Sequence, residues 1–528
     1  MSSSFFAAVS LAAAPMFLFG FNTGVMNAPE SVIFPSHSVL EWSIAVSAFC
    51  VGGFFGANVS GRLADTWGRR PCLVLILVSN AIFGILHVLS PNMTVLIVAR
   101  GGVGVAGGAS TVLTPMYLSE ISPSNIRGSI GTMTQFSCVV GILVSILWAL
   151  PFCTLHTWRI IFLPLPILSG LGLLAIPWGL PESPKWLLMN HYVTRGQEAR
   201  RIMARFRNFH AERDAELIEM EVILSLGGGG GGANGGTSSA PIMTGVVEGG
   251  NREVSQYHST NQREEEEFQD EGVAGVESER QPVNVTTTSG STGRSFRAFA
   301  LDPQNRIPLI SSILFPVAQQ LSGINAVFYY STLFFDGVIP NPQTGTILAF
   351  SVNVLATIVA VLVMDRFGRK TLFSLSAGGM LVGCVLLTLA LKGMLPGSFT
   401  VVAVMLYICF FEIGLGCIPF FLASEMIEPE FLGTVQSISM SSNWFSNFCV
   451  GIMFPFLDKH LGAYSFVPFA VILFFTTLYS LFVLPETRGK SLEEVLLQVN
   501  RGGGIHHARV SVEEDPDTTT QQDSFHEA

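Results

Sequence analysis

Long apolar stretches separated by short polar ones make up most of the chain. A transmembrane helix needs about 20 apolar residues, and about twelve stretches reach that length. Most contain few charged residues, so the pattern predicts an all-α membrane protein and excludes a soluble architecture. The predicted spans begin near Phe5, Glu41, Pro71, Thr94, Gly128, Trp158, Arg306, Gly345, Thr371, Ser398, Thr434 and Ala463.

Three short motifs occur twice in the same order, which indicates an internal duplication. Asp-Thr-Trp-Gly-Arg-Arg at 65–70 returns as Asp-Arg-Phe-Gly-Arg-Lys, Ser-Glu followed by Gly returns in the same form, and Pro-Glu-Ser returns as Pro-Glu-Thr. The second copies lie at 365–370, at 424–433 and at 485–487. Parallel repeats of this kind build the two halves of major-facilitator transporters. The sequence therefore predicts that fold, with twelve transmembrane helices in two six-helix halves.

The duplication divides the chain into four predicted parts. They are a first six-helix half at 1–181, a cytoplasmic linker at 182–305, a second half at 306–484 and a cytoplasmic tail at 485–528. Charged and apolar residues alternate at helical spacing to about residue 226, which predicts short surface helices. The Gly-, Ser-, Thr- and Glu-rich sequence that follows cannot bury a core, and it predicts disorder.

Positive charge sets the predicted orientation. Cytoplasmic loops of membrane proteins carry an excess of Lys and Arg. The loops after spans two and eight are basic, so they and both termini are predicted to face the cytoplasm. The charges are Arg62, Arg69, Arg70, Arg366, Arg369 and Lys370.

Composition agrees with a membrane protein and excludes several other classes. Hydrophobic residues make up 49% of the chain and charged residues 12%, against about 25% charged in a typical soluble protein. The net charge of −10 comes largely from the linker and the tail, and no nucleic-acid partner is expected. Neither the cysteines nor the histidines have metal-ligand spacing, so no metal or cofactor is expected. A GxGxxG pattern at 102–107 lies within an apolar span, where it predicts close helix packing instead of nucleotide binding.

A cluster of amide side chains within the seventh span is the strongest functional signal. Gln319, Gln320 and Asn325 occur within seven residues of a segment that is otherwise apolar, and Gly323 weakens the helix among them. Buried amides need several hydrogen-bond partners each. They could hold neighbouring helices together, but so many uncharged donors and acceptors favour a path for a neutral polyol.

The tenth span contains a predicted hinge. Gly414, Gly416 and Pro419 fall within six residues, and the proline leaves the carbonyl of Leu415 without its helical donor. Glu412 lies beside this hinge. Its carboxyl group could carry a proton or accept a hydrogen bond from a gate residue, and a static kink is an equally simple interpretation.

Charges at neighbouring helix ends predict a cytoplasmic clamp. Arg69, Arg70 and Arg127 lie near Glu120 in the predicted topology, and such pairs can form when the cytoplasmic side closes. Topology alone would also explain the positive loop. In the second half the equivalent pair is Arg369 with Glu425, and Leu432 stands where Arg127 has its counterpart.

These motifs resemble the facilitative glucose transporters of the sugar-porter branch of the major facilitator superfamily. The resemblance covers essentially the whole membrane portion. It rests on FGFNTGVMNAPE (19–30), the GRR and GRK loops, PESPKW, QQLSGINAVFYYS (319–331), FFEIG (410–414), SNW (442–444) and PETRGK.

The resemblance implies an alternating-access carrier for a hexose, and it assigns residue roles. The tyrosines after the amide cluster and the proline of the hinge would belong to a gate: Tyr329, Tyr330 and Pro419. The sugar contacts would be Gln319, Gln320, Asn325, Asn353, Glu412, Asn443 and Trp444. An aromatic ring such as that of Trp444 suits the C–H face of a sugar.

Three departures from the family pattern concern substrate choice. Family members that favour glucose over fructose commonly carry Gln-Leu-Ser where this chain has Pro-Val-Ala at 316–318. A sugar-binding Gln of the fifth span aligns with Ile146, and Phe420 replaces a Trp after the hinge proline. Lost hydrogen-bond partners weaken discrimination. Glucose is the expected substrate, with fructose, galactose or mannose as possible others.

Three functions remain open from the sequence. Facilitative uniport is preferred over proton-coupled symport, because Asn22 stands where symporters typically have Asp in the first span. A non-transporting sugar sensor would be expected to carry a long signalling tail. An enzyme is not expected, because no nucleophile, base and orienting group cluster outside the spans. The expected location is the plasma membrane, and the sequence leaves the oligomeric state open.

Overall fold

The computed structural model describes residues 2–26, 32–35, 38–123, 126–206, 295–329, 342–396, 398–490 and 492–502. The chain divides into two units, Met1–Gly227 with Ser295–Ala528, and Gly228–Arg294. The second unit lies outside the described residues, as does the predicted disordered part of the linker, and everything below concerns the first unit.

The first half of the chain forms six long helices, followed by a surface helix. The helices are α1 (Ser3–Gly24), α2 (Val39–Trp67), α3 (Arg69–Val88), α4 (Met93–Ile121), α5 (Arg127–Ala149), α6 (Pro164–Gly179) and α7 (Pro184–Phe206). Two short 3₁₀ turns, Leu150–Phe152 and Trp158–Phe162, lie between α5 and α6. Helix α7 bends at His191, whose φ of −139° and ψ of 33° are not helical. The part of the linker predicted as short helices is thus helical as far as Phe206.

The second half repeats this plan, with two of its spans divided into separate helices. Its helices are α9 (Phe296–Leu301), α10 (Arg306–Leu321), α11 (Ile324–Tyr329), α13 (Pro342–Met364), α14 (Arg369–Leu391), α15 (Ser398–Ile413), α16 (Ile418–Met426), α17 (Pro429–Leu461), α18 (Val467–Phe482) and α19 (Leu492–Gly502). Short 3₁₀ turns, η4 (Pro303–Asn305) and η5 (Gly462–Tyr464), precede α10 and α18.

Ten helical segments in the described residues are long and apolar enough to cross a membrane. A bent pair, Phe456–Tyr464 with Val467–Phe482, raises the number to as many as eleven. The remaining predicted span begins near Thr434, within the 33-residue helix α17. That helix carries many Ser and Asn residues, such as Ser439 and Asn443, which are buried against other helices. This segment is long enough to span a membrane, and packing against other helices accommodates its polar residues.

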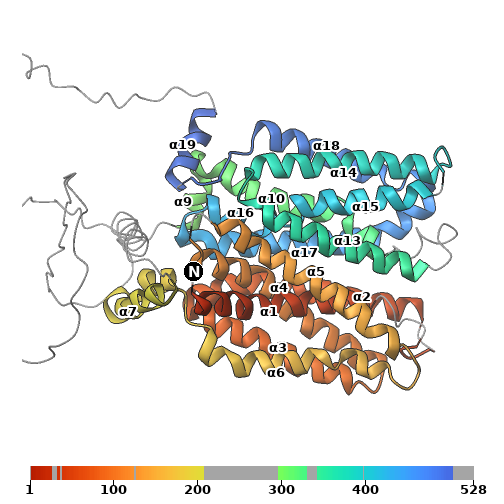
Figure 1. Cartoon of the computed structure of the whole chain (residues 1–528), viewed down its shortest axis with the longest axis horizontal. Coiled ribbons are helices and arrows are strands. Elements are labelled where there is room, and N and C mark those ends of the chain that lie inside the picture. Colours follow the sequence, from red (N-terminus) through yellow and green to blue (C-terminus); the bar gives the residue numbers. More distant parts are fainter. Residues whose placement is uncertain are drawn as a thin grey trace, which may run out of the picture. The chain divides into compact units, whose positions relative to one another are not determined.

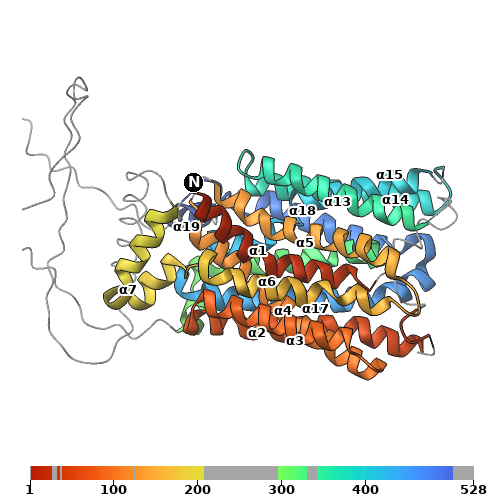
Figure 2. The ribbon, with the colours of Figure 1, turned by 60° about the horizontal axis from the view of Figure 1, so that its bottom comes forward.

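The long helices run side by side (Figure 1). Helices of the first half pack as α2 with α4 and α1 with α5, and helices of the second half as α14 with α15 and with α18. The halves meet where α2 packs against α17 and where α5 packs against α13. The N-terminus, α7 and α19 lie at one end of the helices, which is visible in both ribbon views (Figure 2).

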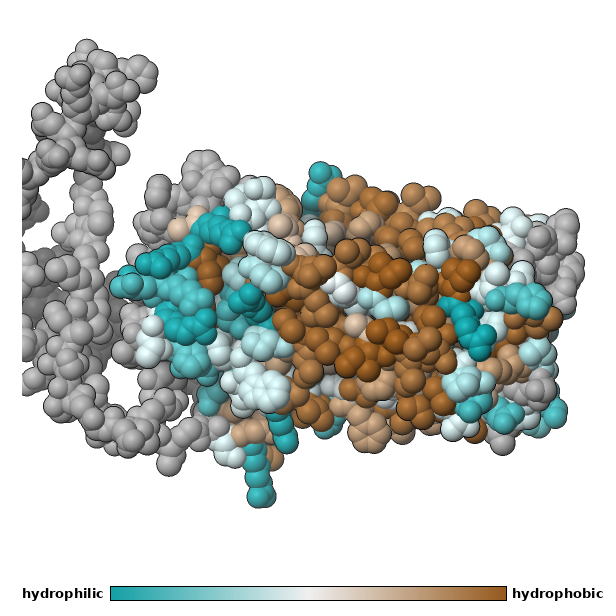
Figure 3. Space-filling model, turned by 90° about the horizontal axis from the view of Figure 1, so that it is seen from below, coloured by the Kyte–Doolittle hydropathy of each residue, from teal (hydrophilic) through white to brown (hydrophobic). Residues whose placement is uncertain are grey.

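The side surface of the described helices suits a lipid solvent. In Figure 3 hydrophobic residues cover the middle of the visible face, and hydrophilic residues gather toward both ends. Exposed apolar side chains include Ile82, Leu174 and Leu362. Exposed hydrocarbon in a band between polar ends is stable only where lipid covers it. The chain is thus a multi-pass membrane protein.

The GxGxxG segment lies in α4 and serves helix packing. A Cβ atom at Gly104 would lie 2.3 Å from the carbonyl oxygen of Phe49 in α2. No side chain fits at that distance, so glycine allows the backbones of α2 and α4 to approach each other. This confirms the packing interpretation of the pattern.

Candidate functional site

Two helix breaks in the second half place backbone groups at the centre of the candidate site. Gly323 has a φ of +90°, a conformation that glycine adopts readily, and it separates α10 from α11. The tenth predicted span breaks between Ile413 and Ile418, and Pro419 lies in the first turn of α16. Both breaks occur where the sequence predicted weak helix.

Gln319 joins the two breaks. Its Nε2 donates to the carbonyl oxygens of Leu415, at 2.8 Å, and Gly416, at 3.1 Å. The carbonyl that Pro419 leaves without a helical donor therefore has a side-chain partner. Gln319 is buried in α10. If the backbone between α15 and α16 moves, Gln319 must therefore either lose these two hydrogen bonds or move with that backbone.

The other amides form a continuous hydrogen-bonded cluster across α10, α11 and α17. Asn443 Nδ2 donates to Gln319 Oε1 at 2.8 Å, and Gln320 Nε2 donates to Asn443 Oδ1 at 3.1 Å. Asn325 Nδ2 donates to Gln320 Oε1 and, at 2.9 Å, to Asn447 Oδ1. All five side chains are uncharged. The sequence marked four of them; Asn447 was missed, although it lies one helical turn after Asn443.

A second polar group lies between α5, α13 and α15, and it has unused hydrogen-bonding capacity. Glu412 Oε1 accepts from Gln135 Nε2 at 3.1 Å, a bond that joins the two halves. Glu412 Oε2 and both amide atoms of Asn353 are buried without a partner among the described residues. Buried polar atoms are rarely left unpaired, so these atoms mark a place for a polar ligand or water.

The fifth span contains an amide that the sequence analysis did not mark. Gln135 in α5 reaches Glu412, whereas Ile146 lies in the hydrophobic core at 5% exposure. The expectation that Ile146 replaces a sugar-binding Gln stays a prediction, and Gln135 lies earlier in the same helix. The only signal for Gln135 in the sequence was a lone Gln in an apolar span.

Trp444 connects α17 to the first half. Its Nε1 donates to Thr111 Oγ1 at 3.2 Å, and the rings of Phe19 and Phe49 meet it edge-on at 5.4 Å. A Cβ atom at Gly53 would lie 2.3 Å from the indole, so the ring packs directly on the α2 backbone. In this structure the ring is 2% exposed and fills the space between the halves.

The predicted gate is described only in part. Tyr329 is the last residue of α11, where its backbone is described but its side chain is not. Tyr330 lies outside the described residues.

The predicted clamp of the first half centres on one arginine. Arg69 Nη2 lies 2.7 Å from Glu120 Oε1 and Arg69 Nη1 3.4 Å from Asp65 Oδ1. Arg70 instead uses its backbone N–H, which donates to Glu182. Within the described parts of the chain, neither Arg70 nor Arg127 forms a side-chain ion pair, and the buried Nε of Arg127 has no partner.

Glu182 caps the start of α3. It accepts from the backbone N–H of Arg69 at 2.9 Å and from that of Ser183 at 2.8 Å. Burial raises the pKa of Glu182, and the backbone donors act in the opposite direction. Carboxylates are favourable at helix N-termini, so the glutamate in the first copy of the Pro-Glu motif stabilises the start of α3.

The second half repeats the clamp. Arg369 Nη2 lies 2.9 Å from Glu425 Oε1 and 3.6 Å from Asp365 Oδ1. Glu486 accepts from the backbone N–H of Arg369 at 2.8 Å, as Glu182 does in the first half. Leu432, which stands where Arg127 has its counterpart, is buried.

Each clamp also reaches the other half of the chain. Asp365 Oδ2 accepts from the backbone N–H of Ser129 at the start of α5, at 2.8 Å. At the start of α17, a Cβ atom at Gly433 would lie 2.2 Å from Asp65 Oδ2. Gly61 N–H donates to Ser437 Oγ at 3.0 Å nearby. The two halves are therefore in contact at the end that carries the clamps.

Comparison with known proteins assigns the fold and the family. A family model described as "Sugar (and other) transporter" matches residues 7–226 and 247–497. The chain belongs to this sugar transporter family. Facilitated glucose transporter member 3 of solute carrier family 2 is 34% identical in Oryctolagus cuniculus over 514 residues, with 92% of this chain and 91% of the relative covered. In Homo sapiens the same transporter is 33% identical over 521 residues, covering 92% and 90%.

Solved structures agree on the fold. The major facilitator proton:xylose symporter XylE bound to 6-bromo-6-deoxy-D-glucose has a TM-score of 0.73 at 21% identity, covering 94% of this chain and 98% of that one. An inward-open XylE from E. coli has a TM-score of 0.63 at 20% identity, covering 94% and 99%. The sugar transporter described here thus has the major facilitator fold.

In this sugar transporter, Arg100 of the fourth span is buried next to Asn22 of the first span, which offers an amide and not a carboxylate. Arg100 Nη1 donates to the backbone carbonyl of Asn22 at 2.9 Å, and its guanidinium lies 4.6 Å from the ring centre of Phe49. The Asn22 side chain donates to the carbonyl of Leu18 at 2.9 Å. Asn22, which stands where symporters typically have Asp, therefore lies beside Arg100.

Proposed function

We propose that the protein is a facilitative hexose carrier that works by alternating access. The observation that carries this proposal is the uncharged amide cluster at two helix breaks, beside buried polar atoms without partners. Amides donate and accept without net charge, which suits a neutral polyol. The relatives described as facilitated glucose transporters support a hexose as the cargo.

The sugar contacts are proposed on the same ground. Asn353 and Glu412 have spare atoms to offer, and the amides of α10, α11 and α17 can exchange their mutual bonds for bonds to hydroxyl groups. Trp444 can offer its ring to the sugar only when the halves separate around it. The proposed set is Gln319, Gln320, Asn325, Asn353, Glu412, Asn443 and Trp444, and we add Gln135 because it donates to Glu412.

Broken helices are the proposed moving parts. Tyr329, Tyr330 and Pro419 would close one side of the path, and the Arg69–Glu120 and Arg369–Glu425 pairs would hold the other side shut. The contacts of Asp65 and Asp365 with the opposite half support this assignment, because they must break when that end opens. Charge pairs that form in one state bias a two-state equilibrium.

Uniport is the proposed mode of transport, and proton-coupled symport is the alternative. XylE, which shares the fold, is a proton:xylose symporter. In this chain the residue beside Arg100 is Asn22, which cannot ionise. Glu412 is a buried acid, but it accepts a hydrogen bond from Gln135, which is consistent with a fixed binding group.

The proposed cellular setting follows the sequence and the relatives. Plasma membrane is the proposed location, with both termini and the clamp-bearing end on the cytoplasmic side. Glucose is the proposed main substrate, and fructose, galactose or mannose are proposed competitors.

Uptake of radiolabelled glucose in a host without its own hexose carriers tests the function directly. Uptake of a non-metabolised analogue should equilibrate with the outside concentration and should not change with a protonophore. Accumulation above the outside level that collapses with the protonophore would replace uniport with symport. No uptake by protein that reaches the cell surface would exclude a transporter for these sugars.

A further inference from the structure

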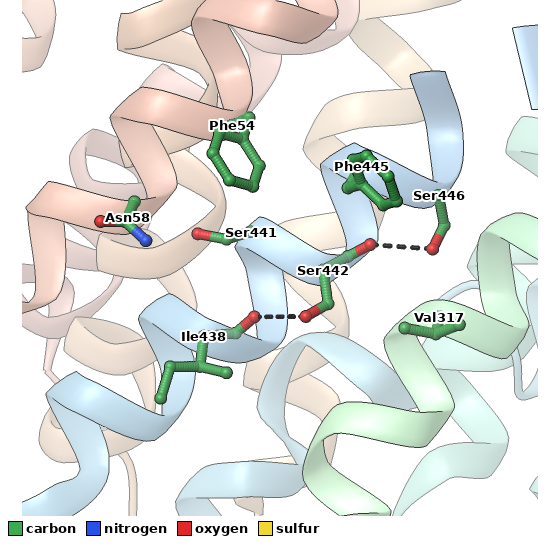
Figure 4. A pocket seen from close by; sticks show the side chains of 8 residues that line it. All are labelled: Phe54, Asn58, Val317, Ile438, Ser441, Ser442, Phe445 and Ser446. Atoms are coloured by element: carbon green, nitrogen blue, oxygen red, sulfur yellow. Dashed lines mark hydrogen bonds between the residues drawn. The ribbon is translucent and has the colours of Figure 1, made fainter. Parts of the chain in front are cut away.

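A pocket of about 550 Å³ lies on the membrane-facing side, between the two halves. Its walls come from α2 of the first half and from α10 and α17 of the second half (Figure 4). Phe54, Val317 and Phe445 supply apolar wall. Phe55 and Phe445, next to or within the pocket, are 59% and 58% exposed. These exposed aromatic side chains place the mouth of the pocket on the lipid-facing surface of the helices.

One wall of this pocket is polar, although it lies within membrane-spanning helix. Asn58 is exposed within the span Ile44–Trp67 and forms no hydrogen bond with any described residue. Polar side chains inside a membrane normally face the protein interior, because an unpaired amide in hydrocarbon is costly. Asn58 is thus a polar group that requires a partner from the membrane side.

Ser441 is the second unpaired group. It is 5% exposed, and its Oγ has no hydrogen-bond partner among the described residues. In Figure 4 it points from α17 toward α2, between Phe54 and Asn58. Ser442 and Ser446 donate to backbone carbonyls of their own helix, at 2.9 and 2.8 Å, so their oxygens can still accept.

We propose that this pocket binds a sterol-class membrane lipid through its hydroxyl group. The lining residues are apolar or uncharged, which suits one neutral hydroxyl and does not suit an anionic headgroup. Asn58 can donate a hydrogen bond to the sterol hydroxyl or accept one from it, and Ser441 can form a further hydrogen bond with the same hydroxyl. A volume of about 550 Å³ lies in the range of small-ligand pockets, and aromatic walls suit a rigid apolar body.

The bound lipid would connect the two halves. Asn58 belongs to α2 and Ser441 to α17, which are packed against each other across the boundary. A ligand held by both helices fits one arrangement of the halves better than another, and therefore shifts the equilibrium between them. This effect on transport rests on the proposed carrier function; the binding itself does not.

Photolabelling of the full-length protein in lipid nanodiscs tests binding without a transport assay. A photoreactive sterol that keeps its hydroxyl should label peptides of α2 and α17, and excess unlabelled sterol should suppress the labelling. Asn58→Leu and Ser441→Ala should each raise the concentration of unlabelled sterol that halves the labelling by roughly two- to tenfold, as expected for the loss of one neutral hydrogen bond. Matched controls are Val59→Leu, an exposed neighbour outside the pocket, and Thr477→Ala, whose hydroxyl bonds to Leu473 in its own helix.

The competitors distinguish this proposal from other occupants. A sterol methyl ether, which cannot donate, should compete more weakly than the sterol. Equal competition by the ether, labelling spread over all lipid-facing helices, or displacement by phospholipid alone would each overturn the proposal. In proteoliposomes, sterol should change the rate of hexose exchange in the wild type but not in the Asn58→Leu/Ser441→Ala double variant. Labelling without hexose exchange would keep the lipid site and reject the carrier function.

Discussion

At the scale of single residues, the proposed site consists of amides that bond to one another, and the proposal is that a sugar replaces those bonds. Gln320 illustrates this, because it donates to Asn443 and accepts from Asn325. In the closed cluster nearly every donor has an acceptor. If these residues bind the sugar as proposed, the exchange of such bonds for bonds to sugar hydroxyls would cost little net free energy, which would allow both binding and release.

Gln320→Ala should weaken the apparent affinity for glucose while surface expression stays near normal. The loss of one neutral hydrogen bond is worth about 0.5–1.5 kcal/mol, or two- to tenfold in affinity. Concentration-dependent uptake, with surface biotinylation to count carriers, measures both quantities. Unchanged affinity with poor expression would instead mean that Gln320 only holds α10 and α17 together.

Gln135→Leu should lower glucose affinity and relax selectivity among hexoses. Gln135 is the amide that α5 offers to Glu412, and a site with fewer polar groups penalises a wrong sugar less. Competition by fructose, galactose and mannose against labelled glucose gives the readout. The native carrier should already show competition from one of them, because Pro316-Val317-Ala318 departs from the glucose-selective pattern. Ile146→Val is the matched control in the same helix, since Ile146 lies in the apolar core; an equal effect of both changes would contradict the role of Gln135.

At the scale of helices, two kinds of feature are relevant to transport: breaks within helices and contacts between the two halves. Breaks at Gly323 and before Ile418 give α10–α11 and α15–α16 places to bend, and Gln319 joins them. The starts of α5 and α17, in contrast, receive the carboxylates of Asp365 and Asp65 from the opposite half. Carboxylates are favourable at helix N-termini, so these contacts stabilise closure at that end.

Gly433→Ala should favour opening of the clamp-bearing end. The added Cβ would lie 2.2 Å from Asp65 Oδ2, and overpacking of this kind typically costs 1–3 kcal/mol, roughly a fivefold to hundredfold change in the equilibrium. Hydrogen–deuterium exchange at the starts of α5 and α17 should rise. Gly378→Ala is the control, since its nearest neighbour would lie 3.8 Å away. Equal exchange in both variants would mean that these contacts do not control closure.

At the scale of the whole molecule, transport requires the two halves to move against each other. Their boundary contains Trp444 on Thr111, Gln135 on Glu412 and the two clamps. Every one of these contacts lies in the described helices. The long segment between α7 and α9 contributes none of them.

Deletion of residues 227–295 should leave hexose uptake largely intact. The amide cluster, the helix breaks and the clamps all lie outside that segment, so its loss removes no described contact of the site. Uptake normalised to surface expression provides the measurement, and a deletion that starts at residue 184 and removes α7 serves as the disruptive comparison. Abolished uptake by correctly localised protein would show that the segment takes part in gating.

The duplicated motifs show how much of this protein's structure can be predicted from the order of residues along the chain. Apolar runs predicted the spans, and repeated Gly-Arg and Pro-Glu motifs predicted two related halves with the same clamp. Gly323 and Pro419 located both helix breaks, because each acts on its own backbone. Arg127 was expected in the clamp because it lies near Glu120 in the predicted topology, but the structure leaves its Nε without a partner among the described residues.

The sequence by itself determined the membrane fold, the halves and the neutral chemistry of the site, since hydropathy, repetition and local backbone preferences are properties of short segments. Only the tertiary structure decided which side chains meet. Gln135 reaches Glu412 and Trp444 fills the space beside Gly53 because helices far apart in the chain pack together. Such partners depend on the rotation and spacing of whole helices, which no single segment encodes.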